Sequence, residues 1–331
     1  MFRYLLLVAG LTAAAQAAAR DKPVLTVYTY DSFVTEWGPG PAVKGAFEEV
    51  CACTLDFVSA GDGASLLSRL QLEGARGQAD IVLGIDTGLT DRARRTGLFA
   101  PLARQPENLD LPIEWSDVTF VPYNWGYFAF VYDRTRLANP PASFGDMIRA
   151  DGLKVVIQDP RSSTPGLGLL LWVRTAYPDA SRTIWEGLAP RILTVTKGWS
   201  EAYGLFRDGE ADMVLSYTTS PAYHLIAEAD DTKAAASFAE GHYMQIEVAG
   251  KLAATDQPEL ADMFLEFVTS PEFQGVIPTT NWMYPVKFPP EGLPEGFETL
   301  ITPERSLILS DVEAAAQRDA ALAEWIEALS R

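Results

Sequence analysis

The sequence of 331 residues contains very little cysteine and histidine, with two residues of each type. His224 and His242 belong to no HExxH or His-x-His arrangement, so metal catalysis is poorly supported. No GxSxG, Walker-type or strand-linked GxGxxG motif occurs, so no familiar catalytic machinery is indicated. The formal net charge of −18 argues against nucleic acid or anionic membranes as partners. The acidic charge also weakly favours cationic ligands, although solubility explains an acidic surface equally well.

Apolar runs are also short, apart from one at the N-terminus. Arg3 precedes an apolar stretch over residues 4–15, which leads into a series of small residues ending at Ala19. A basic start, an apolar core too short for an anchor and an Ala-x-Ala exit predict a secretory signal peptide over residues 1–19. No later run is long enough to cross a bilayer. We therefore expect a soluble exported protein of the periplasm.

The two cysteines, Cys51 and Cys53, are separated by one residue. In an oxidising compartment they can close a very small disulfide ring, which removes little chain entropy. The simplest interpretation is a local staple between a helix end and a strand. A copper-binding pair or a nucleophile would need a nearby His or Met, and none is close in sequence.

The rest of the chain alternates strand and helix signals, which predicts an α/β protein with parallel sheets covered by helices. A second α/β series begins after Phe120, and no flexible linker separates it from the first. We predict two lobes: 20–121 together with 250–331, and 122–249. Crossing segments are expected at 120–124 and 245–251. Ligands bind beyond the carboxyl ends of such strands, so two facing sheets form a cleft that closes on a ligand. The expected strands are 24–28, 54–58, 79–83, 127–132, 155–158, 192–195, 211–217 and 243–249, and the expected helices are 41–50, 63–73, 165–177, 200–207, 258–269 and 311–329, with another beginning at Pro221.

Hydroxyl side chains gather at two expected helix starts. Thr218, Thr219 and Ser220 follow an apolar strand, with Ser220 at the expected N-cap before a proline. Ser163 and Thr164 precede another proline in the same way. Helix N-termini bind anions through their free N–H groups. Capping accounts for one hydroxyl at each start, so we expect the two clusters to bind one anionic group together.

Asp62 and Gly63 open a further expected helix, and two roles remain open for Asp62. It either caps that helix or offers a carboxylate to a cationic ligand, with Gly63 allowing close approach of the backbone. Aromatic residues at strand ends and in loops are a stronger signal, because their faces suit stacking and cation–π contacts. They are Tyr30, Trp37, Trp199, Tyr217, Tyr223 and Trp282. Together these residues predict a site for a molecule with both a ring and a negative tail.

Several segments of the chain resemble the thiamine-binding periplasmic proteins of bacterial thiamine ABC transporters. They occur in order through nearly the whole sequence: VLTVYTYDSF (24–33), WGPGP (37–41), GYFAFVYD (126–133), QDPRSSTPGLGLLLW (158–172), TVTKGWSEAYGLF (194–206), SYTTSPAY (216–223) and NWMYP (281–285). The resemblance implies a type II periplasmic binding protein fold, with two α/β lobes of mixed, mainly parallel sheets joined by two crossing strands. It further implies a cleft for thiamine, thiamine monophosphate or thiamine pyrophosphate as transported ligand, no cofactor, and a permease of the inner membrane as partner. We expect a monomer.

Carried over by motif, the resemblance implies ligand contacts from both lobes. Asp62 and Gly63 would contact the ligand from lobe one, and Tyr30 and Trp37 would line the cleft. Tyr223 and Trp282 would enclose the aminopyrimidine. The phosphate side would be received by Ser163, Thr164, Trp199, Tyr217, Thr218, Thr219 and Ser220.

This chain departs from the family next to one crossing segment. The family tends to carry an aspartate and a tyrosine where this chain has Asn124 and Trp125. If these positions touch the ligand, charge complementarity is weaker here. The preference among the phosphate forms therefore stays open.

Two other functions are compatible with this fold. A thiamine-degrading transferase would use Cys51 or Cys53 as a thiolate nucleophile beside a carboxylate base. A ferric-ion binding protein would use tyrosinates such as Tyr217 and Tyr223, although iron sites of this kind use adjacent tyrosines. We expect a binding protein rather than an enzyme.

Overall fold

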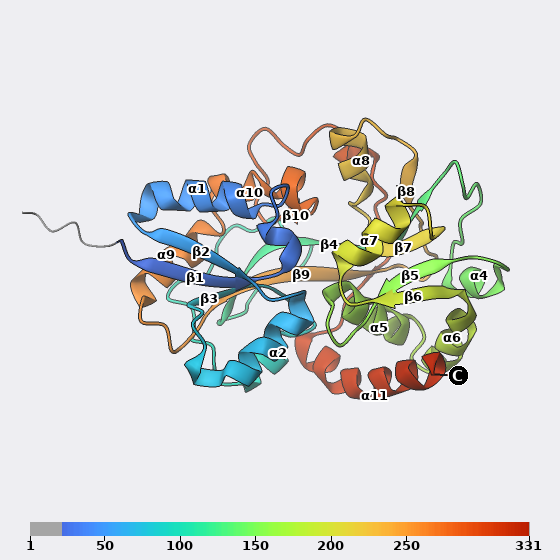
Figure 1. Ribbon diagram of the computed structural model, residues 1–331, viewed down its shortest axis with the longest axis horizontal. Coiled ribbons are helices and arrows are strands. Elements are labelled where there is room, and N and C mark those ends of the chain that lie inside the picture. The colour runs from blue at the N-terminus through green and yellow to red at the C-terminus, as the bar shows by residue number, and fades with distance from the viewer. Residues whose placement is uncertain (1–21, 331) are drawn as a thin grey trace, which may run out of the picture.

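The computed structural model describes residues 22–330, and in this part of the chain an 11-stranded sheet runs through the molecule (Figure 1). Its main path has the order β2-β1-β3-β9-β4-β7-β5-β6, with β8 and β10 pairing with β4 and β11 pairing with β9. The signal peptide predicted for residues 1–19 lies outside the described residues. The strands are β1 Val24–Thr29, β2 Thr54–Ser59, β3 Ile81–Asp86, β4 Phe120–Asp133, β5 Val155–Gln158, β6 Ile192–Thr196, β7 Met213–Tyr217, β8 Lys233–Ala235, β9 His242–Lys251, β10 Tyr284–Pro285 and β11 Ser306–Leu307.

Helices lie above and below the sheet in the view of Figure 1. Proline stands in the first turn of α1, α5, α8, α9 and α10, where its missing N–H needs no partner. A short π-helix at Ile277–Asn281 precedes β10. The α-helices are α1 Gly40–Cys51, α2 Gly63–Glu73, α3 Thr90–Arg95, α4 Phe144–Arg149, α5 Thr164–Ala176, α6 Ser181–Leu188, α7 Trp199–Arg207, α8 Pro221–Ala227, α9 Pro258–Phe267, α10 Pro271–Gln274 and α11 Asp311–Leu329.

Each end of the sheet is parallel and its centre is antiparallel. β1 pairs in parallel with β2 and β3, and β5 pairs in parallel with β6 and β7. Between these groups, β4 and β9 run antiparallel to each other and to their outer neighbours β7 and β3. The two-lobed α/β fold predicted from the sequence is therefore confirmed, with a mixed sheet.

Strands β4 and β9 are longer than the sequence pattern predicts. The segments expected as crossings, 120–124 and 245–251, are the ends of these two strands, which continue into both halves of the sheet. All ten residues of β9 are buried, since helices and loops cover it on both faces. The expected crossings and the strands beside them are thus continuous strands. The lobe boundaries themselves stay a prediction.

Aromatic rings pack together in both halves of the molecule. On the side of β1, Phe47 packs edge-to-face on Phe264 with ring centroids 5.0 Å apart. On the side of β5, Trp172 packs against Phe144 at 4.9 Å. Burial of each such ring contributes about 2–3 kcal/mol. The cluster around Trp172 also includes Leu66 and Val82 from the side of β1, so buried apolar contacts continue between the two halves.

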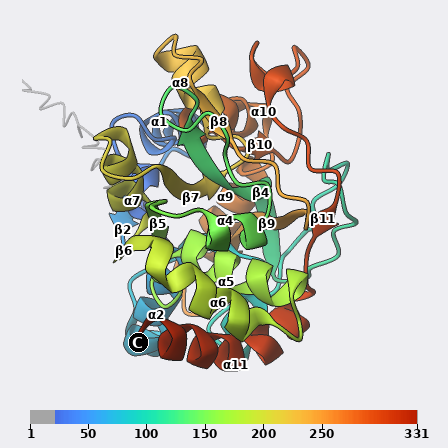
Figure 2. The same cartoon turned by 90° about the vertical axis from the view of Figure 1, so that its right-hand side faces the viewer.

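The C-terminal helix α11 lies across the bottom of the molecule (Figure 2). Its Ser310 and Glu313 form a reciprocal capping box, which satisfies two free N–H groups at the helix start. Although the sequence analysis grouped this helix with lobe one, Arg174 of α5 and Arg182 of α6 form ion pairs with Glu324 and Glu327 of α11. α11 thus also packs on helices of lobe two.

Two sequence predictions concern the surface of the fold. Cys51 and Cys53 form a disulfide at the end of α1, directly before β2, so the predicted staple between helix and strand is confirmed. Among residues 22–330, the search for a helix with the length and hydropathy of a membrane span finds none.

Candidate ligand-binding site

A cavity of about 470 Å³ is lined by residues from both halves of the molecule. Its volume lies within the usual range for small-molecule sites. The structure brings most of the predicted site residues together around this cavity. Those in the lining are Tyr30, Trp37, Asp62, Trp199, Tyr217, Ser220, Tyr223 and Trp282.

The remaining predicted residues lie behind the lining and are buried. Ser163 and Thr164 open α5, and Thr218 and Thr219 follow β7. The Oγ1 atoms of Thr164 and Thr218 have no hydrogen-bond partner within residues 22–330. Gly63 lies so close to Thr164 that a Cβ there would stand 2.2 Å from the threonine Oγ1. Whether these residues contact a ligand stays a prediction.

Asp62 connects α2 with the two helix starts of the opposite half. Its Oδ1 accepts the N–H of Gly63 at 2.8 Å, and its Oδ2 accepts the hydroxyl of Ser163 at 2.7 Å. The backbone N–H groups of Thr164 and Trp199, the first residues of α5 and α7, also favour the charged form of this carboxylate. Burial raises the pKa of Asp62, whereas these hydrogen bonds oppose the rise. Asp62 is thus a helix cap, and the same carboxylate lines the cavity.

A second contact joins the halves beside Asp62. The backbone N–H and the hydroxyl of Ser65 in α2 both donate to the carbonyl of Ser162, at 3.0 and 3.1 Å. The starts of α2 and α5 therefore touch across the cavity. The two halves of the molecule are thus closed on each other at this edge of the cavity.

The predicted capping role of Ser220 is only partly right. Ser220 stands at the N-cap position of α8, but its side chain makes no capping hydrogen bond. Its Oγ instead accepts the N–H of Tyr217 at 3.1 Å and pairs with the Ser216 hydroxyl at 2.7 Å. The reason is that Ser220 has helical backbone angles, which turn its hydroxyl back toward the strand end.

Aromatic rings form the walls of the cavity. Trp199 stacks on Tyr203 with centroids 4.8 Å apart, and its Nε1 donates to Ser216 at 2.8 Å. Tyr223 and Trp282 meet edge-to-face at 5.4 Å, so a flat ligand ring would have to part them to lie between them. Trp282 follows the π-helix with a φ of +57°, a conformation that costs energy for a bulky residue.

The first lobe contributes a tyrosine beside a glycine that cannot be replaced freely. The Tyr30 ring lies against Gly84, where a Cβ would stand 2.2 Å from the ring. Gly84 has a φ of +110°, which also favours glycine. Trp37, in contrast, is 54% exposed at the margin of the cavity. These two aromatics therefore differ, since only Tyr30 is held rigidly.

The sequence analysis missed the carboxylate of Glu247, which also lines the cavity. Glu247 is buried in β9 and accepts hydrogen bonds from Tyr30, Tyr123 and Asn124. Burial raises its pKa to about 7. Residues 243–249 were predicted to form an extended strand without a functional residue. The feature that could have identified the site is the glutamate within this mainly apolar segment.

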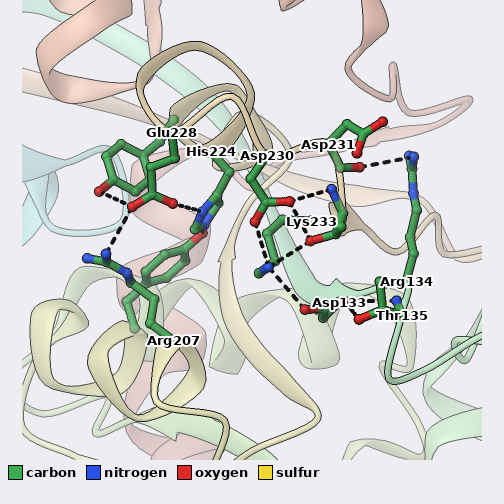
Figure 3. Close-up of polar contacts among 12 residues, drawn as sticks. Asp133, Arg134, Thr135, Arg207, His224, Glu228, Asp230, Asp231 and Lys233 are labelled. Atoms are coloured by element: carbon green, nitrogen blue, oxygen red, sulfur yellow. Dashed lines mark hydrogen bonds and ion pairs between the residues drawn. The ribbon is translucent and has the colours of Figure 1, made fainter.

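His224, Glu228 and Arg207 belong to a polar network at α7 and α8 (Figure 3). The Tyr203 hydroxyl contacts Nε2 of His224 at 2.9 Å, and the Tyr223 hydroxyl donates to Glu228 at 2.7 Å. His224 and Glu228 are themselves hydrogen-bonded at 2.7 Å. Burial lowers the pKa of His224. The network holds two aromatic walls of the cavity from behind.

The same network includes the side chains His224, Glu228 and Asp230, whose ligand atoms lie within 4.8 Å of one another. Each already has a partner: Arg207 pairs with Glu228, and Lys233 pairs with Asp230. A metal ion would have to compete with both cations. We therefore interpret this group as a network that compensates its own charges.

Comparisons with known proteins identify the family and the fold of the chain. The family model of bacterial extracellular solute-binding proteins matches residues 77–299. The chain is 55% identical over 311 residues to the thiamine-binding periplasmic protein of Escherichia coli (strain K12), covering 94% of each sequence. It superimposes on a solved periplasmic thiamin binding protein with a TM-score of 0.92 at 55% identity, covering 95% of this chain and 98% of that one. A ferric binding protein from Campylobacter jejuni, at 17% identity and a TM-score of 0.74 over 92% and 99% of the chains, shares the fold alone.

Proposed function

Because the chain belongs to the family of bacterial extracellular solute-binding proteins, we propose that it captures thiamine in the periplasm and delivers it to an ABC permease of the inner membrane. The cavity carries this proposal. Its aromatic walls suit a flat pyrimidine, and the carboxylates of Asp62 and Glu247 suit the permanent positive charge of the thiazolium.

The proposal includes the phosphate esters of thiamine as ligands. The backbone N–H groups at the starts of α5 and α7 favour the charged form of the Asp62 carboxylate, which supports this edge of the cavity as the place for a phosphate. The unpaired hydroxyl of Thr164 adds a donor beside it. A phosphate bound at this edge of the cavity would accept hydrogen bonds from some of these donors.

Capture requires no covalent step and no cofactor in this proposal. The protein acts as a monomer whose lobes close on the ligand, and the ligand favours the closed form because it contacts both lobes. A transferase using Cys51 or Cys53 is disfavoured, since the two are joined in a disulfide and neither lines the cavity. The chain's relatives are named as binding proteins.

Ferric-ion binding is disfavoured by the tyrosines themselves. The Tyr217 hydroxyl donates to Gln245 at 3.4 Å, whereas the Tyr223 hydroxyl donates to Glu228 at 2.7 Å. The Tyr217 hydroxyl thus has its partner on β9, whereas the Tyr223 hydroxyl has its partner at the end of α8. Burial raises the pKa of Tyr217 well above its usual value, which opposes formation of a tyrosinate.

Native mass spectrometry of the mature protein, purified without added ligand, followed by calorimetry with thiamine and its mono- and diphosphate, tests the proposal. We expect one ligand per protein monomer and tight binding of at least thiamine. Ferric ion, added separately, should give no visible charge-transfer band. Absence of binding to all three forms of thiamine would refute the proposed function.

A further inference from the structure

Glu247 is a carboxylate with no cationic partner. The residue is only 6% exposed and lines the cavity. Among residues 22–330, no lysine, arginine or histidine lies within ion-pair distance of it, and the cationic side chain in the lining, Arg207, is paired with Glu228. A buried charge without a partner costs free energy. Burial of ionised Glu247 at the floor of the cavity therefore has a free-energy cost.

The hydrogen bonds to Glu247 all converge on one of its two oxygens. Asn124 Nδ2 donates to Oε2 at 2.6 Å, the Tyr123 hydroxyl at 2.8 Å and the Tyr30 hydroxyl at 3.2 Å. No hydrogen bond from the described residues reaches Oε1. Asn124 and Tyr123 therefore fix the carboxylate, with Tyr30 sharing its single proton between Glu247 and Asn281 Oδ1 at 2.9 Å, and one carboxylate oxygen is left for another group.

Other groups near Glu247 are acidic or neutral. Asp86 of β3 is the register partner of Glu247 on β9, and burial together with the charge of Glu247 raises the pKa of Asp86 to about 8. The negative charge of Asp62 also raises the pKa of Glu247. The negative charge of Glu247 in turn raises the pKa of Tyr217. The floor of the cavity is thus an environment in which a positive charge is stabilised.

We propose that Glu247 is the cation-recognising residue of the cavity, with Oε1 facing the positive ring of the ligand and Oε2 held by Tyr30, Tyr123 and Asn124. This inference rests on the proposed function, because the thiazolium supplies the positive charge. Asp62 is a weaker counter-ion, since its carboxylate is already compensated by helix N-termini. Glu247 then selects the charge of the ligand, while the aromatic walls select its shape.

The first test separates a binding role from a structural one. Glu247→Gln keeps the size and removes the charge, so it should raise the melting temperature of the ligand-free protein at about pH 8, where the glutamate is ionised. The gain should vanish at about pH 5, because there Glu247 is protonated in the wild type. The exposed Glu304→Gln, which changes the net charge equally, serves as the matched control. A structural role for Glu247 predicts a lower melting temperature at both pH values.

The second test varies the charge of the ligand. Calorimetry compares thiamine with its deaza analogue, in which a neutral thiophene replaces the thiazolium. Glu247→Gln should weaken thiamine binding about 100-fold while changing binding of the neutral analogue by less than about 3-fold. Glu304→Gln should alter neither.

The outcomes separate the inference from the function on which it rests. If wild-type protein fails to bind thiamine, the proposed function is refuted. If the wild type binds thiamine but Glu247→Gln weakens both ligands equally, the function stands and the inference is overturned. Weaker binding of thiamine alone, with a more stable ligand-free protein, supports the inference.

Discussion

The two carboxylates of the cavity differ in how their charge is compensated. Asp62 receives a hydroxyl and backbone N–H groups, including those that start α5 and α7. Glu247 receives two hydroxyls and an amide, and no helix start points at it. The negative charge of Asp62 is therefore offset in part by hydrogen bonds from the protein, whereas Glu247 has no positively charged side chain paired with it among residues 22–330. The comparison suggests that one end of the cavity holds the lobes together and the other recognises the ligand.

A large effect, comparable to that expected for Glu247→Gln, should come from blocking the contact at the Asp62 end. In Gly63→Ala, the new Cβ would stand 2.2 Å from Thr164 Oγ1 and 2.8 Å from the carbonyl of Gly84. Because such overpacking costs about 1–3 kcal/mol, thiamine affinity should fall about 10- to 100-fold. Calorimetry measures this fall.

Gly45→Ala is the control for that change, since nothing lies within 4 Å of a Cβ at Gly45. This control should keep wild-type affinity and gain up to about 1 kcal/mol in stability. Equal affinities of the two variants would contradict the view that the starts of α2 and α5 must meet.

The Glu247 end should make thiamine binding depend on pH. Since the pKa of Glu247 is raised to about 7 and only the ionised form attracts the cation, affinity should be greatest above that pKa and decrease below it. Between about pH 8 and about pH 6 the decrease should be about 10-fold. Calorimetry over this range, with Glu247→Gln as a variant that lacks the dependence, provides the measurement.

Asn124 offers a way to change that pH dependence without touching Glu247. Asn124→Asp places a second carboxyl 2.6 Å from Glu247 Oε2, so that the two share one proton and keep one negative charge to lower pH. Thiamine affinity of this variant should be retained at a pH where that of the wild type has fallen. An unchanged pH profile would show that Glu247 is not the titrating group.

A smaller effect is expected from neutralising the Asp62 end. Asp62→Asn removes a negative charge beside the helix starts while keeping a residue type that caps helices well. Binding of thiamine monophosphate should improve relative to thiamine by about 5- to 10-fold, because the phosphate no longer meets a like charge. Calorimetric titration with both ligands gives the ratio, and an unchanged ratio would place the phosphate elsewhere.

The smallest effect should come from the disulfide, which belongs to neither end of the cavity. The ring closed by Cys51 and Cys53 has a sequence separation of 2, so its loss should cost at most about 2 kcal/mol. The variant with both cysteines replaced by alanine should therefore melt a few degrees lower and bind thiamine as the wild type does. A large loss of affinity would link α1 to the cavity.

Local sequence patterns predicted most elements, because hydrophobic period and capping signals are local. α2 and α11 have the predicted bounds, and proline marks the start of α8 as expected. The short helices α4 and α6 were missed. With 6 and 8 residues, they give only a short periodic pattern, and helices of this length depend on tertiary packing for stability.

Site residues were predictable where they stand at strand ends or helix starts. Tyr30, Trp199 and Ser220 were found in this way and line the cavity. Glu247 was not found, because it lies inside a buried strand and not at a strand end or helix start. Only the pairing of β9 with β3 and β4 places it beside Asp86 and Asn124.

The sequence by itself determined the α/β class, the helix starts and the aromatic residues around a ring-binding site, since these depend on neighbours along the chain. Tertiary structure alone decided how charge is arranged in that site. Whether a carboxylate is compensated depends on which groups from distant segments surround it, as the different surroundings of Asp62 and Glu247 show.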